Sequence, residues 1–99
     1  MANLKLYLAE GFRGDHVVVK VDGRTVFDSD GVTTKDLYGL AEELKPVQVK
    51  GDKAKIEIEL PDKGVNAAFS ADLKRGNQVP ISLEDGQITH FVGRNIGFA

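Results

Sequence analysis

Few residues in this chain have the chemistry of a catalytic or metal-binding site. His16 and His90 are the only histidines, and cysteine is absent. Nucleophilic triads and zinc sites need several converging groups, and no serine stands at a suggestive spacing from the Asp15-His16 pair. We expect His16 to be partly exposed and His90 to be a hydrogen-bonded histidine at the rim of the core. The sequence therefore predicts no catalytic residues, no cofactor and no metal site.

Asp28-Ser29-Asp30-Gly31 is the segment that resembles the start of a calcium loop. An EF-hand loop supplies about six to eight oxygen ligands and needs glycine at its sixth position. Here the glycine comes fourth, residues 32–35 contain no carboxylate, and Lys35 brings a charge of the wrong sign. We interpret the segment as a polar turn that binds no calcium.

A second weak candidate is the basic loop Lys74-Arg75-Gly76-Asn77, because backbone amides in such loops can hold an anion. Two positive charges beside a glycine more often mark a solvated turn. A carbohydrate site is poorly supported, because stacking platforms are usually Trp or Tyr and the chain has no Trp and two Tyr. Two alternatives stay open: a module that binds calcium, an anion or a carbohydrate through its end loops, and a small enzyme with an unrecognised site.

Composition narrows the classes of function further. The 99 residues suffice for one domain, residues 1–99, because two halves would each be too small to bury a useful core. A formal net charge of −2 lacks the basic surplus that general nucleic-acid binding requires. No segment reaches the roughly 20 apolar residues that cross a bilayer, and the N-terminus lacks the pattern of a signal peptide. We expect a cytoplasmic protein that binds neither nucleic acid nor membrane.

The sequence pattern predicts β-strands, and these would position the side chains of any functional site. Apolar alternation around Asp22-Gly23 predicts a hairpin with a two-residue type I′ turn, since both turn positions need positive φ and these residues tolerate it. The turn fixes the register and hence the face on which each side chain lies. The predicted cross-strand pairs are Val21–Arg24, Val19–Val26 and Val18–Phe27.

The same alternation predicts a first strand at Leu4–Leu8 and three more hairpins. Segments 47–50 and 53–60 flank Gly51-Asp52, and 53–60 should also pair with 65–73 through the turn at 61–64. Strands 79–84 and 87–92 surround Asp85-Gly86, a second type I′ candidate. The predicted pairs are Lys50–Lys53, Val49–Ala54 and Val47–Ile56, then Leu60–Val65, Ile58–Ala67 and Ile56–Phe69, and finally Leu83–Ile88, Ile81–His90 and Val79–Val92.

One segment, residues 35–44, is ambiguous. Leu37, Leu40, Ala41 and Leu44 have helical spacing, whereas Gly39 disfavours a helix by about 1 kcal/mol relative to alanine. We predict a short helix over 35–44. The competing interpretation is an irregular strand or loop that crosses between two sheets.

Seven or eight strands separated by regular turn signals predict an all-β fold, a small antiparallel β-sandwich that is immunoglobulin-like in architecture. The predicted registers place Val18 opposite Phe27, and Pro80 opposite Phe91, on outer sheet faces. Clustered exposed apolar residues often mark an interface. We therefore predict a non-catalytic protein-interaction or self-assembly module that meets a protein partner or a second copy through these four residues. The alternative is that residues 35–44 or the tail at 96–98 cover them within the monomer.

Overall fold

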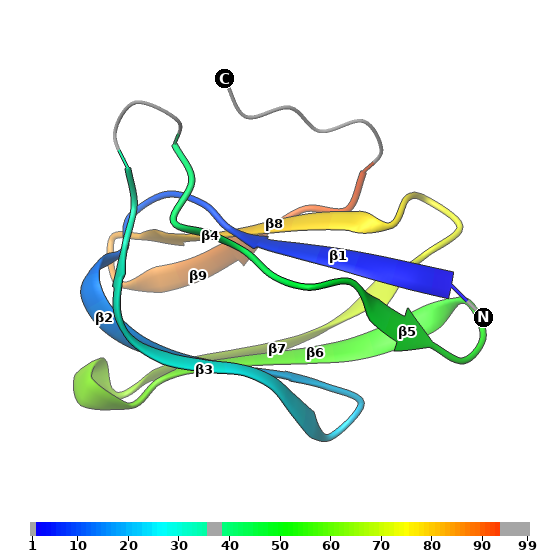
Figure 1. Ribbon diagram of the computed structural model, residues 1–99, viewed down its shortest axis with the longest axis horizontal. Coiled ribbons are helices and arrows are strands. Elements are labelled where there is room, and N and C mark those ends of the chain that lie inside the picture. The colour runs from blue at the N-terminus through cyan, green and yellow to red at the C-terminus, as the bar shows by residue number, and fades with distance from the viewer. Residues whose placement is uncertain (1, 36–38, 94–99) are drawn as a thin grey trace.

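The computed structural model describes residues 2–35 and 39–93, which form two β-sheets packed face to face (Figure 1). A 3-10 turn, η1 (Pro61–Lys63), joins two of the strands. No helix in these two ranges is long and apolar enough to cross a membrane. The strands are β1 (Ala2–Leu8), β2 (Arg13–Val21), β3 (Arg24–Thr33), β4 (Glu42–Glu43), β5 (Val47–Val49), β6 (Lys53–Leu60), β7 (Val65–Asp72), β8 (Gln78–Glu84) and β9 (Gln87–His90).

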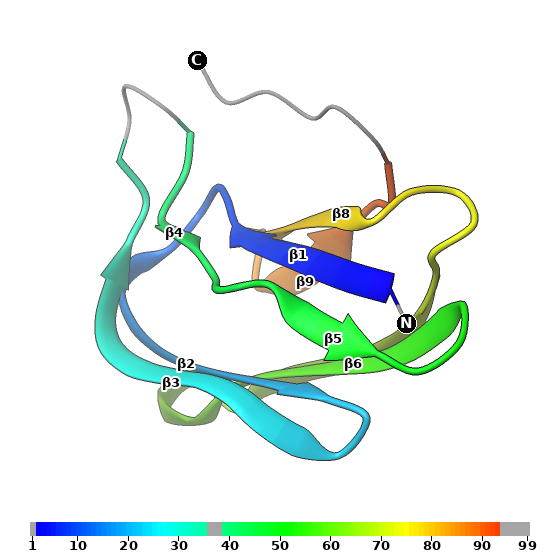
Figure 2. The same cartoon turned by 45° about the vertical axis from the view of Figure 1, so that its right-hand side comes forward.

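The two sheets differ in their pairing. The four-stranded sheet has the order β3-β2-β6-β7 and is antiparallel throughout. In the five-stranded sheet β1 lies beside β8, β8 lies beside β9, and β4 and β5 pair in succession along the other edge of β1 (Figure 2). β1 and β8 run parallel, so this sheet is mixed. The predicted all-β sandwich is confirmed, with one parallel pair in place of a purely antiparallel arrangement.

A single hydrophobic core fills the space between the sheets. Strand alternation builds it, because every second side chain of a strand points to the same face. β6 shows this most clearly: Ala54, Ile56, Ile58 and Leu60 are buried, and the residues between them are exposed or half-buried. The largest fully buried side chains are Phe12, Leu4, Leu6, Leu8, Ile56, Ile58, Leu60, Ile81, Val17, Val19, Val21 and Val49.

Two of the predicted hairpins form in the predicted register. β6 pairs with β7 from Leu60–Val65 through Ile56–Phe69 without a shift. β8 pairs with β9 through Leu83–Ile88 and Ile81–His90. Both residues of the Asp85-Gly86 turn have positive φ, 50° and 77°, as a type I′ turn requires.

The hairpin at Asp22-Gly23 forms, but its predicted register is wrong beyond the turn. Val21 pairs with Arg24 as predicted, and Lys20 with Thr25, yet Val19 then pairs with Phe27 rather than Val26. Val26 is the extra residue of a β-bulge, which moves Phe27, Asp28 and Ser29 to the opposite face until the next register shift, between Asp15 and Val17 of β2. Val18 consequently faces Asp28, not Phe27.

The predicted hairpin between 47–50 and 53–60 is also wrong. Val49 pairs with Ala2 and Val47 with Leu4, so β5 belongs to the sheet of β1. β6 lies in the other sheet, between β2 and β7. The Gly51-Asp52 turn therefore carries the chain from one sheet to the other. A glycine with positive φ (80° at Gly51) suits either connection, so the local signal did not distinguish them.

The predicted helix over 35–44 is not present in the described part of that segment. Lys35 and Leu40 form an antiparallel bridge, and Glu42–Glu43 is the short strand β4. Residues 36–38 lie outside the described residues. The competing interpretation, an irregular strand that crosses between sheets, is the correct one, since the segment leads from β3 to β4 and β5 (Figure 2).

Candidate functional site

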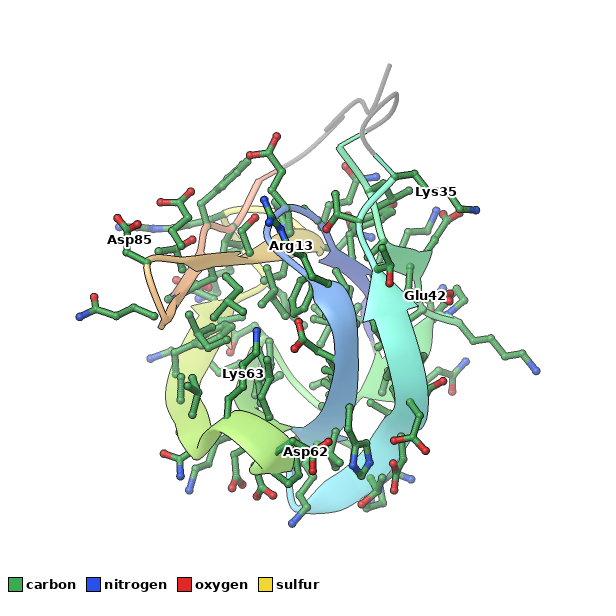
Figure 3. All side chains as sticks on the ribbon, turned by 90° about the vertical axis from the view of Figure 1, so that its left-hand side faces the viewer. Arg13, Lys35, Glu42, Asp62, Lys63 and Asp85 are labelled. Atoms are coloured by element: carbon green, nitrogen blue, oxygen red, sulfur yellow. The ribbon has the colours of Figure 1, made fainter. Side chains whose placement is uncertain are left out.

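The most distinctive surface of the protein is the side of the sandwich where the edge strands β7 and β9 lie near each other. β7 is the end of the four-stranded sheet and pairs, within the described ranges, with β6 alone. In Figure 3 it forms one outer side of the sandwich, opposite β3. Its register with β6 covers all eight residues without a bulge.

The hydrogen-bond alternation shows which backbone groups of β7 face outward. The Leu73 amide donates to the Asp52 carbonyl over 2.7 Å, just beyond the Lys53–Asp72 pair. Antiparallel partners alternate between hydrogen-bonded and non-bonded pairs, so every second residue before Leu73 also bonds to β6. The residues between them direct their N–H and C=O groups away from β6. These outward residues are Asn66, Ala68 and Ser70.

The side chains of β7 do not protect this edge. Natural edge strands usually carry lysine, proline, an inward charge or a bulge that prevents pairing with other chains. Residues 65–71 contain no charge and no proline. Their outer-face side chains, Asn66, Ala68 and Ser70, are small and exposed, and the core-side Val65, Ala67 and Phe69 are half-buried. β7 is thus an open edge of 8 residues that leaves apolar surface partly uncovered.

An open hollow of about 630 Å³ lies between the end of β7 and the end of β9. Ser70 and Asp72 line it from β7, and His90, Phe91 and Val92 line it from the other sheet. Phe91 is 58% exposed and is the one large exposed apolar side chain among the described residues. Its ring places apolar surface at the border of the hollow.

His90 contributes an aromatic ring to this side, where we expected a hydrogen-bonded histidine at the rim of the core; the contact that the structure shows is a ring stack. His90 is exposed, and its ring stacks on Phe69 of β7 with the centroids 3.5 Å apart and the planes at 8°. Burial by neighbouring atoms lowers the pKa of His90 below its ordinary value of 6.5, so the ring is mainly neutral at pH 7. The stack joins the edges of the two sheets.

Two cationic residues, Lys53 and Arg75, also line the hollow. Both are exposed, and neither forms an ion pair with the described residues. Lys74 of the predicted basic loop instead contacts Asp52, with 3.1 Å between Nζ and Oδ2, and this hydrogen bond lowers the pKa of the Asp52 carboxyl. The basic loop therefore gives the border of the hollow a positive charge through Arg75.

The structure does not bring the four predicted interface residues together. Phe27 packs against the core because of the bulge at Val26, and Pro80 is buried. Val18 is half-buried on the outer face, between Asp28 and Glu59 of the neighbouring strands. Phe91 keeps its predicted position opposite Pro80, whose carbonyl accepts the Phe91 amide at 3.4 Å. Of the four, Phe91 alone presents a large exposed surface.

His16 lies on β2 of the four-stranded sheet, beside the edge strand β3, and is partly exposed as predicted. Its Nε2 is 2.7 Å from Oδ1 of Asp28, and its Nδ1 is 3.6 Å from Oδ1 of Asp30. The hydrogen bond with Asp28 raises the pKa of His16, helped by the charges of Asp30, Asp28 and Asp62 and opposed by burial. His16 therefore binds β3 to β2 most strongly when it is protonated.

The segment that resembled a calcium loop is part of β3 and not a turn, because Asp28 to Gly31 pair or bulge along β2. No group of three or more acidic, histidine or cysteine side chains in residues 2–35 and 39–93 could hold a metal ion. The tail at 96–98, which could have covered an outer face, lies outside the described residues.

An ion pair between a buried aspartate and an exposed lysine, which the sequence did not indicate, links η1 to β2. Asp15 is 6% exposed, and its Oδ1 contacts Nζ of Lys63 at 2.9 Å, while the Arg13 amide donates to its Oδ2. Burial alone would raise the pKa of Asp15, but the bond and charge of Lys63 and the Arg13 amide outweigh it and lower the pKa. In Figure 3 the Lys63 side chain rises from the turn toward the space between the sheets. This pair fixes the start of β7.

No family model matches this chain, and neither the curated proteins nor the solved structures that were compared contain a significant match. The immunoglobulin-like description therefore refers to the two-sheet arrangement alone.

Proposed function

We propose that this protein is a non-catalytic protein-interaction module that binds an extended strand of another polypeptide along β7. One observation carries the proposal: β7 is a regular edge, uncharged over residues 65–71, whose Asn66, Ala68 and Ser70 backbone groups face outward without a paired strand in the described ranges. Strand addition supplies main-chain hydrogen bonds from the edge and specificity from the side chains beside it. Phe91 and the hollow next to it provide that side-chain surface.

Two features support a binding role rather than a catalytic one. The histidines lie apart: His16 forms an ion pair with Asp28 near β3, and His90 stacks on Phe69 of β7. Neither contacts a serine hydroxyl in the described part of the chain. A cytoplasmic location, which the sequence predicts, belongs to the same proposal, and cell fractionation tests it.

Site-specific photo-crosslinking in the native cell tests the function. The photoreactive side chain replaces Ser70 on β7 or, in the matched control, Thr25 on the bulged edge β3; both residues are exposed. We expect polypeptide adducts from position 70 in large excess over those from position 25. A second substitution, Ala68→Pro, should suppress the adducts because it removes an outward donor and no β6–β7 hydrogen bond. Equal adducts at both positions, or none at position 70, would contradict the proposal.

A further inference from the structure

We infer that the strand which β7 accepts is β7 of a second copy of this chain, related by a two-fold axis through Ala68. This inference rests on the proposed function and names the partner. Two copies would pair antiparallel, edge to edge, and join their four-stranded sheets into one continuous sheet. Three independent matches along the strand support this pairing.

The backbone groups match first. In a two-fold antiparallel pair centred on Ala68, that residue faces its own copy, and Asn66 faces Ser70 of the second copy. All three residues direct their N–H and C=O groups outward, as the alternation set by Leu73 and Asp52 requires. Every outward group from Asn66 to Ser70 thus finds a partner in this register. Shifting the register by one residue would oppose outward groups to inward ones.

The side-chain sizes match next. On the core side the same register places Phe69 opposite Ala67 of the second copy, and Val65 opposite Ala71. A large side chain faces a small one at each position, so the half-buried Val65 and Phe69 are covered without a clash. On the outer side the amide of Asn66 lies beside the hydroxyl of Ser70, and the two alanines at position 68 leave room at the axis.

The charges at the two ends of β7 match as well. The exposed Asp62 in η1 precedes the strand, and the exposed Lys53 and Arg75 lie at its other end. An antiparallel second copy brings opposite ends together, so Asp62 of each copy approaches Lys53 and Arg75 at the border of the other copy's hollow, which Asp72 also lines. The outer face of β6 has the same distribution of charge. Lys55 lies beside Ser70, and Glu59 lies beside Asn66. A parallel arrangement would place like charges together.

The other edge of this sheet does not offer the same fit. β3 has three register shifts against β2, at Arg13/Asp15, Asp15/Val17 and Val19/Lys20. It also carries the acidic residues Asp28 and Asp30 on its exposed surface. Bulges and charges of this kind prevent edge pairing. Association through β7 is therefore closed at two copies and does not extend into a fibre.

A charge exchange at the axis tests the pairing. Ala68 is exposed, so neither Ala68→Glu nor Ala68→Lys should perturb the fold, which circular dichroism checks. Light scattering on a sizing column should give twice the 10.7 kDa monomer mass for the wild type. Each variant alone should dissociate at least about tenfold more readily, since like charges then face each other. An equimolar mixture of the two variants should regain the dimer.

Cysteine crosslinking tests the register, because the chain has no cysteine of its own. Ala68→Cys should form a disulfide with its copy under mild oxidation, since paired Cα atoms lie about 5.5 Å apart. Asn66→Cys is the matched control: its copy would lie about 14 Å away along the strand, too far to bridge. A mixture of Asn66→Cys and Ser70→Cys should crosslink as a heterodimer.

The outcomes separate this inference from the proposed function. A monomeric wild type at millimolar concentration, a dimer unaffected by both charge variants, or faster crosslinking of Asn66→Cys than of Ala68→Cys would each overturn the second copy as partner. If Ser70 adducts to a different polypeptide nevertheless form and Ala68→Pro suppresses them, the interaction function stands without the dimer. If those adducts are absent and the wild type is monomeric, both fail.

Discussion

The strands β3 and β7 form the two edges of the same four-stranded sheet, yet they are built in opposite ways. β3 follows β2 with three register shifts, and its exposed residues include two aspartates. β7 follows β6 without a shift, and residues 65–71 carry no charge. Both edges belong to one sheet and meet the same solvent, so the difference between them comes from their own residues and registers. An edge without bulges or charges is suited to another strand.

The bulge at Val26 also determines which side chain of β3 packs against the hydrophobic core. The extra residue Val26 moves Phe27 to the face of Val19, where it packs against the core. Phe91, which follows the regular hairpin of β8 and β9, stays 58% exposed. One added residue thus changes a predicted interface side chain into a structural one, because the period of a strand is two.

Single-residue deletions test this contrast and should give the largest effects. Deleting Ala67 from β7 shifts the rest of the strand by one residue and turns Phe69 from the core side to the outer face. We expect the loss of several kcal/mol of stability, on the order of a full core residue. Deleting Val26 from β3 removes only the bulge and keeps Phe27 opposite Val19, so the expected loss is about 1 kcal/mol. Urea denaturation measures both.

The Val26 deletion has a second consequence. A straighter β3 loses one of its protections against pairing, so this variant should self-associate more than the wild type at high concentration, as light scattering can show. Comparable instability of the two deletions would mean that the bulge is needed for folding itself. An unchanged stability in the Ala67 deletion would contradict the β7 register.

Alanine substitutions of the two phenylalanines should give the next largest difference. Phe27→Ala removes a half-buried ring that packs against the core, and we expect a loss of about 2 kcal/mol. Phe91→Ala removes a mainly exposed ring and should cost less than about 0.5 kcal/mol. Thermal unfolding at low protein concentration separates these effects from association. Equal losses would show that Phe91 is covered in the monomer.

The sequence predicted those parts of the fold that depend on neighbouring residues in the chain, and it failed where distant segments decide the structure. The β6–β7 and β8–β9 hairpins were predictable because adjacent strands and a short turn define their register. The bulge at Val26 was not predictable, because the apolar alternation on both sides of Asp22-Gly23 fits a ladder without a bulge equally well. The Gly51-Asp52 turn was misassigned because a hairpin and a crossing between sheets use the same turn residues.

The candidate site shows the same limit. The uncharged run of residues 65–71 was visible in the sequence, but whether that strand lies at an edge depends on the order of the sheet. Phe91 was predicted as exposed because its position depends only on the β8–β9 hairpin. The ion pair between Asp15 and Lys63 could not be predicted from the sequence, because it joins residues far apart in the chain through the packing of η1 on β2.

The smallest expected effect is the pH dependence of the two histidines, which lie in different sheets, His16 on β2 and His90 at the end of β9. Hydrogen bonding to Asp28, with the nearby charges of Asp30 and Asp62, raises the folded-state pKa of His16 above 6.5. A raised pKa means that the stability it contributes is complete below about pH 6.5 and is lost as the pH rises through the folded-state value. Burial lowers the pKa of His90, so its contribution has the opposite sign and is lost as the pH falls below 6.5.

Substitution separates the two contributions. In urea titrations between pH 5 and pH 8, His16→Gln should leave a protein whose stability rises with pH, because the contribution of His90 then remains. His90→Gln should leave one whose stability falls with pH above about 6.5. Asp28→Asn should act like His16→Gln, because it removes the first cause of the His16 shift. If Asp28→Asn leaves the wild-type pH profile unchanged, the Asp28 contact does not hold β3 to β2, and the antiparallel backbone pairing of the two strands keeps that edge in place.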